Sequence, residues 1–328
     1  MSSTEKQRVD LYSRITDKIV EDLAKGVRPW MKPWNTANTA GRITQPLRYN
    51  GQSYSGVNVL LLWSEGIARG YTSSTWMTFR QALELGAAVR KGETGTTVVF
   101  ASRFIKSETD GNGGELEREI PFLKAYSVFN AEQIDGLPDQ YRHRQAPVLD
   151  RAARIENADR YFRNTGAAIR HGGNQAYFAP SADIIQMPPF ESFKDPASYY
   201  ATLSHEVTHW TAPAHRVGRD LSRYAKDKTE RAREELIAEL GSCFLCADLG
   251  IAPELEPRPD HASYLACWLE VLSTDRRVIF QAAAHAQQAV TFLHSLQPEG
   301  ADERSYRVRL ISIGRCPRTR PELLPIRW

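Results

Sequence analysis

The chain has 328 residues and a net charge of +3, with 41% hydrophobic and 25% charged residues, the balance of a globular protein of about two ordinary domains. This balance excludes wholesale disorder and fibrous repeats, and no apolar run approaches the roughly 20 residues that a membrane helix needs. A polar N-terminus without a signal-peptide core, together with four cysteines, predicts a reduced cytoplasmic protein without membrane contact.

The charge is unevenly distributed along the chain. Residues 1–106 hold 15 Lys and Arg against 8 Asp and Glu, a net charge of +7, and residues 107–328 hold 27 against 31, a net charge of −4. Two parts of opposite sign predict two roles, the first of them facing an anion such as nucleic acid.

Hydrophobic periodicity and turn residues predict an α+β arrangement for the first part of the chain. A first helix begins at Thr4 and ends at Gly26, and a loop rich in Pro, Trp and Asn follows it. Asn50-Gly51 predicts a hairpin turn before an apolar segment over 57–63. The further elements predicted here are a helix over 75–85, a β-hairpin of 87–90 with 96–104, a flexible tip over 110–114 and a strand over 120–129.

The second part is predicted to be mainly helical, with one small sheet. Its expected helices cover 149–165, 196–211, 229–249, 259–273 and 275–296, and its extended segments cover 175–178 and 183–187. Gly136, Pro138 and Pro147 indicate a linker between the two parts. We therefore expect an α+β protein with domains over 1–130 and 149–328 and a linker over 131–148.

The motif His205-Glu-Val-Thr-His209 carries the clearest chemical signal. Two histidines four residues apart lie on one face of a helix, so their imidazoles can bind one metal ion, and the spacing matches the zinc-peptidase pattern. Pro196 suits the first turn of such a helix. Zinc is the expected metal, although imidazole and carboxylate ligands also accept manganese or cobalt.

A third ligand is required, and the sequence offers two types. His215 follows His209 at the metzincin spacing, but that family needs a methionine turn downstream, and every methionine lies upstream. The gluzincin alternative is a glutamate on a second helix. There we expect Glu235 as the ligand and Glu239, on the same helical face, as the group that orients a ligating histidine, with Glu234 as the fallback ligand.

Three protein ligands leave an open position for water, whose pKa the metal lowers toward neutrality. Glu206 is then predicted to accept the proton, so that hydroxide attacks a peptide carbonyl. Tyr177, Tyr224 and His215 are alternative donors to the oxyanion, and the sequence does not choose among them. A further hypothesis is that the extended segment over 175–178 aligns the peptide.

The basic part of the chain combines aromatic and cationic residues in a way that suits single-stranded nucleic acid. Bases stack on aromatic rings while phosphates meet Lys and Arg. Trp63 and Trp76 lie in apolar segments and are predicted to be core. The expected DNA contacts are Trp30, Lys32, Trp34, Arg48, Tyr54, Arg80, Arg90 and Lys91.

These motifs, in their order, resemble the ArdC family of plasmid antirestriction proteins. The stretches that carry the resemblance begin at Pro29, Tyr54, Trp76 and Val89 in the first part and at Leu203 and Glu234 in the second; they cover most of residues 5–250. The resemblance implies an N-terminal domain that binds single-stranded DNA and a zincin-like metallopeptidase domain. It also implies a role in conjugation, the shielding of entering plasmid DNA from host restriction.

Three functions remain open at this point. The first is a metallopeptidase tethered to single-stranded DNA, which cuts an unidentified protein met on that DNA. The second is a DNA-binding protector without enzymatic activity, whose metal is structural, and a third, weaker option is a binder of double-stranded DNA. Glu206 favours the first, because a structural site needs no general base.

Overall fold

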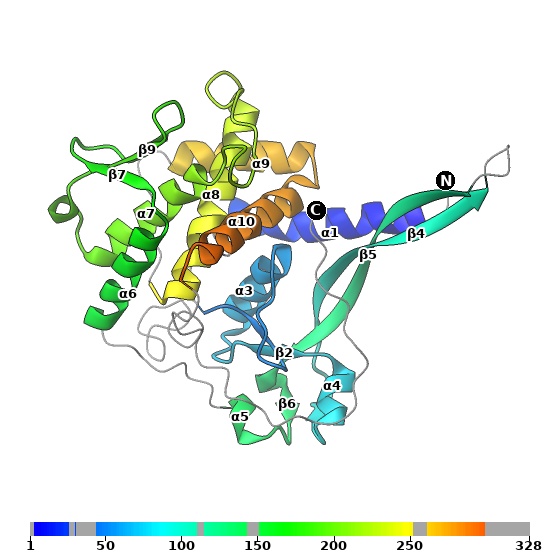
Figure 1. Ribbon diagram of the computed structural model, residues 1–328. Helices are drawn as coiled ribbons and strands as arrows, with labels where there is room; N and C mark the ends of the chain where they lie inside the picture. Colours follow the sequence, from blue (N-terminus) through cyan, green and yellow to red (C-terminus); the bar gives the residue numbers. More distant parts are fainter. Residues whose placement is uncertain are drawn as a thin grey trace.

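The computed structural model describes residues 3–25, 30, 44–109, 115–142, 151–251 and 261–298. Helices and three small sheets make up these residues, which confirms the expected α+β class (Figure 1). Within the described ranges, no helix combines the length and the hydropathy that a bilayer crossing requires.

The first half of the chain contains one long helix, a mixed sheet and several short elements. They are α1 (Ser3–Ala24), β1 (Leu47–Arg48), α3 (Val57–Arg69), β2 (Thr75–Met77), α4 (Phe79–Glu84), β3 (Ala88–Val89), β4 (Thr96–Thr109), β5 (Glu115–Asn130), η1 (Ala131–Gln133), β6 (Ile134–Asp135) and α5 (Asp139–Arg142). The main sheet has the order β1-β2-β5-β4, in which β1 and β2 are parallel and the other neighbours antiparallel. β4 and β5 form a long twisted hairpin that projects from the body of the molecule (Figure 1).

Two expectations for this half are wrong, although the first helix and the strand ending near Asn130 are confirmed. β3 pairs with β6 and β4 pairs with β5, so 87–90 and 96–104 form no hairpin with each other. The predicted helix over 75–85 begins only at Phe79, because Thr78 and Gln81 form a capping box that fixes the start of α4. Residues 75–77 are strand β2 instead. The expected tip over 110–114 lies outside the described residues.

The second half is mainly helical, as expected. Its elements are α6 (Arg151–Asn164), β7 (Ala168–His171), β8 (Tyr177–Ala179), β9 (Ile184–Met187), η2 (Phe190–Ser192), α7 (Pro196–Trp210), α8 (Lys228–Leu249), α9 (His261–Thr274) and α10 (Val278–Ser295). Strand β7 was not predicted. The small sheet has the order β7-β9-β8, which makes β8 an edge strand paired antiparallel to β9.

Much of the segment expected to be a linker is folded. Residues 131–142 form η1, β6 and α5, and Ile134, Leu137 and Tyr141 are buried in one cluster with Met77 and Ala82 of the first half. This part of the segment therefore packs with the first half of the chain. Residues 143–148 of the predicted linker lie outside the described residues.

The two halves share one hydrophobic core. Helix α1 packs on α9 and on the start of α10, with the rings of Tyr12 and Phe280 4.6 Å apart and the Thr16 hydroxyl donating to the Arg276 carbonyl at 2.6 Å. Deeper in the molecule, Trp63 of α3 lies 5.9 Å from Phe244 of α8. One continuous cluster of buried residues thus runs from α1 and α3 through α7, α8 and α10.

Candidate metal centre

Two adjacent helices, α7 and α8, supply the site. The Asp195 side chain accepts a hydrogen bond from the Ser198 amide and caps α7, whose remaining length is almost entirely buried. Asp227 caps α8 in the same way, and Gly250 ends that helix in the left-handed conformation. The caps define where each helix begins and ends, and the buried residues of α7 and α8 pack against each other.

The predicted ligands come together between these helices. His205, His209 and Glu235 are buried and offer ligand atoms that lie within 4.8 Å of one another. The Nε2 atom of His205 lies 3.3 Å from one oxygen of Glu235, and the Nε2 atom of His209 lies 3.7 Å from the other oxygen. Two imidazoles and one carboxylate form a donor set that suits a divalent cation of the zinc type.

Both imidazoles turn their second nitrogen toward another carboxylate of α8. The Nδ1 atom of His205 lies 3.9 Å from an oxygen of Glu239, the residue that we expected to orient a ligating histidine. His209 Nδ1 lies 3.0 Å from a Glu234 oxygen, within hydrogen-bonding distance. Glu234 is therefore placed as the partner of a ligand and not as the fallback ligand, because it faces the nitrogen of His209 that points away from Glu235.

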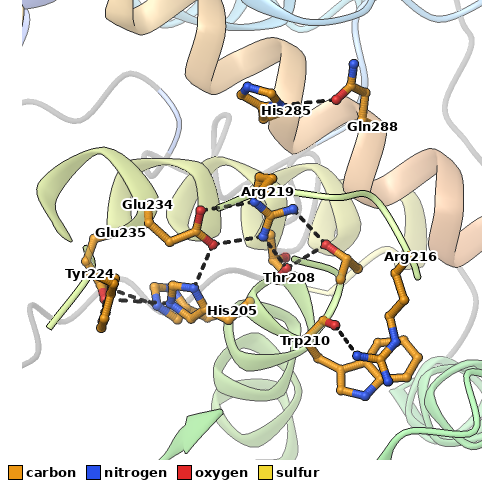
Figure 2. Close-up of polar contacts among 12 residues, drawn as sticks. His205, Thr208, Trp210, Arg216, Arg219, Tyr224, Glu234, Glu235, His285 and Gln288 are labelled. Atoms are coloured by element: carbon orange, nitrogen blue, oxygen red, sulfur yellow. Dashed lines mark hydrogen bonds and ion pairs between the residues drawn. The ribbon is translucent and has the colours of Figure 1, made fainter. Parts of the chain in front are cut away.

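A buried arginine that the sequence analysis missed completes this arrangement. Arg219 donates to both oxygens of Glu234, at 3.0 Å from Nε and 2.8 Å from an Nη atom (Figure 2). It also donates at 2.8 Å to the Thr211 hydroxyl and to the Thr208 carbonyl at the end of α7. No local pattern indicates this role, since Arg219 lies in a loop 15 residues before Glu234.

Electrostatics favour the charged forms of two residues of the cluster, His209 and Glu235. Burial opposes a charge on His209, but its hydrogen bond with Glu234 and the nearby Glu235 carboxylate together raise its pKa to about 9. Burial also opposes a charge on Glu235, yet the hydrogen bond with His205 and the charge of His209 lower its pKa to about 2. A metal ion must therefore displace a proton from His209 when it binds.

The ligands line a cleft of about 390 Å³ that also contains the proposed general base. Glu206 is only 4% exposed and contributes to the lining, as do Tyr177 of β8 and Tyr224 of the loop before α8. The Tyr224 hydroxyl donates to the Glu235 carboxylate (Figure 2). His215 is exposed and is not among the residues that line the cleft, so the geometry favours Glu235 over His215 as the third ligand.

Two of the expected DNA contacts are buried. Trp30 is fully buried and packs edge-on against Trp268 of α9, with ring centroids 6.3 Å apart, so the expectation that it stacks on a base is wrong. Tyr54 is 9% exposed beneath the guanidinium of Arg48, and its burial raises its pKa to about 12. Trp63 and Trp76 are core residues, as predicted.

The other expected contacts lie in different surroundings. Arg48, Arg80 and Lys91 are exposed, and Arg80 pairs with Glu84 at 2.9 Å. Arg90 pairs with Glu93 at 2.7 Å. Lys32 and Trp34 lie outside the described residues. Among the described residues of the first half, the exposed aromatic residues are Phe79, Phe100 and Tyr126, and none of them is among the expected DNA contacts.

Two family models match this chain. Residues 9–129 match the N-terminal domain of the anti-restriction factor ArdC, and residues 156–285 match a zincin-like metallopeptidase. An uncharacterized protein, y4eC, of Sinorhizobium fredii (strain NBRC 101917 / NGR234) is 41% identical over 90% of this chain and 95% of its own length. The DNA primase TraC of Escherichia coli is 34% identical over 90% of this chain, which spans only 28% of TraC.

Solved structures agree with these matches. The metal-free crystal structure of the antirestriction ArdC protein from the R388 plasmid superposes with a TM-score of 0.73 at 43% identity, over 88% of this chain and 97% of that one. Its Mn(II)-bound structure gives a TM-score of 0.68 at 42% identity, over 87% and 97%. The Mn(II) ion of that relative, together with the donor set described above, supports a divalent metal site here. The chain therefore belongs to the ArdC antirestriction family and combines an ArdC-type N-terminal domain with a zincin-like domain.

Proposed function

We propose that this protein is an antirestriction factor that binds single-stranded DNA during plasmid conjugation and cleaves a protein with a metal-dependent peptidase site. One observation carries the peptidase assignment: Glu206 lines the same cleft as His205, His209 and Glu235. A purely structural metal site is closed by its ligands, whereas this one opens onto a cleft with a carboxylate beside it.

In this proposal, different residues of the cleft bind the metal, transfer the proton and stabilise the oxyanion during peptide hydrolysis. His205, His209 and Glu235 would hold the cation, which supplies a Lewis acid that polarises the peptide carbonyl and acidifies water. Glu206 accepts a proton from the attacking water and returns it to the leaving amine. Tyr224 donates its hydroxyl proton to Glu235 and keeps that carboxylate oriented, which leaves Tyr177 as the candidate donor to the oxyanion.

The position of β8 supports a role in aligning the substrate. It is an edge strand, and its residues Tyr177 and Phe178, with the neighbouring Ala176 and Pro180, line the cleft. An edge strand offers unpaired backbone groups to an extended peptide, which can then add to the sheet. A peptide bound in this way would pass over the metal ligands of α7.

The proposed surface for single-stranded DNA lies on the β4–β5 hairpin. Phe100 and Tyr126 are 44% and 47% exposed there, and Phe100 is opposite Lys124 in the strand register. The Lys124 ammonium lies 5.2 Å from the centre of the Phe122 ring, and that ring lies 6.2 Å from Phe100. Exposed rings beside a cation are the combination that stacks on bases and meets phosphates.

The decisive experiment compares cleavage of DNA-bound proteins by the wild type and by Glu206→Gln. Both proteins are loaded with Zn²⁺ or Mn²⁺ and offered a panel of substrate proteins on single-stranded DNA. We expect fragments with the wild type alone, because glutamine cannot accept the proton. If both proteins bind metal and neither cleaves, the metal is structural and the function is protection by DNA binding alone. Competition between single- and double-stranded oligonucleotides at fixed salt tests the DNA preference.

A further inference from the structure

The loop that follows α7 carries two arginines whose side chains are only 8% and 5% exposed, Arg216 and Arg219, and they contact different elements. Its backbone is tied to the end of the helix, with the Val217 amide donating to the Thr211 carbonyl at 3.0 Å and the Arg219 amide to the Ala212 carbonyl at 2.7 Å. From this loop, Arg219 reaches α8, as described above, and Arg216 reaches the small sheet.

Arg216 joins the metal helix to the β8–β9 turn. Its two Nη atoms donate to the two oxygens of Asp183 at 2.8 and 2.5 Å. One of them also donates to the Trp210 carbonyl at 2.8 Å, the contact drawn in Figure 2. The guanidinium lies 3.7 Å from the centre of the Trp210 ring. The arginine side chain is only 8% exposed, so little water competes for these bonds. Trp210 directly follows the ligand His209.

Asp183 lies in the turn between β8 and β9 in an unusual conformation. Its φ angle of 52° makes it the one residue other than glycine with positive φ among the described residues. This conformation is unfavourable for most side chains, although aspartate and asparagine tolerate it. Asp183 is half exposed, so burial of apolar area does not hold it in place. The paired hydrogen bonds from Arg216 connect this turn to the loop that follows α7 and, through the Trp210 carbonyl, to the end of α7 itself.

We propose that Arg216 and Asp183 form a clamp that holds edge strand β8 at a fixed position over the metal helix, and that both are positioning residues for an extended peptide substrate. The peptide substrate named in this proposal depends on the proposed peptidase function. The clamp itself depends only on the described contacts. Strand β8 is three residues long and pairs with β9 on one side, so the turn that joins them controls where its free edge lies.

Hydrogen exchange of the metal-loaded protein tests the clamp without any substrate. Arg216→Lys keeps the charge but removes the paired donors and the stacked guanidinium, and Asp183→Asn keeps a residue that tolerates positive φ. In both variants we expect amide exchange over 177–187 to accelerate about ten- to hundredfold, the effect of losing a charge-assisted contact. Exchange that stays at the wild-type rate in both variants overturns the clamp.

Two further variants separate this effect from a general loss of structure. Arg223→Gln removes an exposed arginine of the same region, which pairs with Glu230 at 3.2 Å, and should leave exchange over 177–187 unchanged. Arg219→Lys alters the other arginine of the loop and should weaken Mn²⁺ binding while exchange over 177–187 stays near the wild-type rate. Isothermal titration with Mn²⁺ should give nearly wild-type affinity for Arg216→Lys.

Steady-state kinetics on a cleaved protein then test substrate positioning. We expect Arg216→Lys and Asp183→Asn to raise KM several-fold with a smaller change in kcat, because the edge strand binds the peptide while the metal ligands stay in place. An unchanged KM in variants whose β8 exchange is accelerated overturns the positioning role. A wild type that cleaves nothing overturns the peptidase function and the positioning role together, whereas the exchange data still decide whether the clamp exists.

Discussion

Gly241 of α8 lies directly against Thr208 of α7, so that a Cβ atom at Gly241 would lie 2.6 Å from Thr208 Cγ2. Only a residue without a side chain permits this approach. The crossing brings α8 close enough for Glu235, less than two turns earlier, to reach His205 and His209. The metal site therefore depends on a glycine that makes no contact with it.

We expect Gly241→Ala to destabilise the protein by about 1–3 kcal/mol, the usual effect of overpacking a close-packed core. It should also weaken Mn²⁺ binding, because the helices must separate. Thermal denaturation and isothermal titration measure the two effects. Adding Thr208→Ala removes the two closest atoms and should restore part of both losses; a double variant no better than Gly241→Ala would contradict this explanation.

The second prediction concerns the partners of His209. Glu234→Gln and Arg219→Lys should each weaken Mn²⁺ binding about 10- to 100-fold, because the imidazole loses the group that orients it. The absorption spectrum of the Co²⁺-loaded protein should change as well, since it reports ligand geometry. Glu230→Gln, in the partly exposed first turn of the same helix, is the matched control. Equal metal affinity in Glu234→Gln and Glu230→Gln would show that Glu234 does not orient the ligand.

The pKa of His209 predicts how the stability of the metal-free protein depends on pH. Because folding raises this pKa from 6.5 to about 9, the imidazolium stabilises the fold fully below about pH 6.5, and this contribution is lost as the pH rises through about 9. Folding lowers the pKa of Glu235 from 4.5 to about 2, so its contribution is present above about pH 4.5 and is lost toward pH 2. Thermal melts in EDTA should therefore show stability falling between pH 6.5 and 9. His209→Gln should lose this fall, and a wild-type Tm that stays level over that interval would contradict the prediction.

Local patterns predicted the parts of the site that depend on local geometry. The spacing of His205 and His209 fixes a shared helical face whatever the tertiary structure, and Pro196 marks the start of that helix. The choice of Glu235 over His215 rested on the missing methionine turn and on the four-residue spacing that places Glu235 and Glu239 on one helical face. These inferences depend on periodicity within one element, which a sequence carries directly.

Contacts between distant segments escaped prediction for a physical reason. Both sides of α8 are buried, so helical periodicity could not tell whether Glu234 or Glu239 would hydrogen-bond a ligating histidine. Arg219 and Arg216 lie in a loop whose path no local sequence pattern specifies. Their partners, Glu234 and Asp183, therefore could not be predicted. The prediction of a hairpin between 87–90 and 96–104 was wrong for the same reason, because β3 pairs with β6, some 45 residues further along the chain.

The fourth prediction tests the proposed DNA surface of the β4–β5 hairpin. Phe100→Ala and Tyr126→Ala should each weaken binding of single-stranded DNA by about 1–3 kcal/mol, the contribution of one aromatic stack. Both residues are nearly half exposed, so thermal stability should change little. Fluorescence anisotropy with a labelled oligonucleotide at fixed salt measures the affinity. Tyr177→Ala, an equally exposed aromatic of the other domain, is the control; if it weakens binding as much as Phe100→Ala, the hairpin is not the DNA surface.

The last prediction separates a core role of Trp30 from the DNA contact that the sequence suggested. Trp30 packs against Trp268, which lines the cleft and donates from Nε1 to the Ala232 carbonyl of α8 at 3.0 Å. Trp30→Ala should therefore destabilise the fold by about 3–5 kcal/mol, as expected for a large cavity, and weaken Mn²⁺ binding by loosening the wall beside Glu235. Phe79→Ala, which removes an aromatic side chain that is 52% exposed, should leave both properties nearly unchanged. Wild-type stability together with reduced DNA affinity in Trp30→Ala would show that Trp30 contacts DNA and has no core role. We expect the opposite, because a fully buried indole that supports the metal cleft is not accessible to a base.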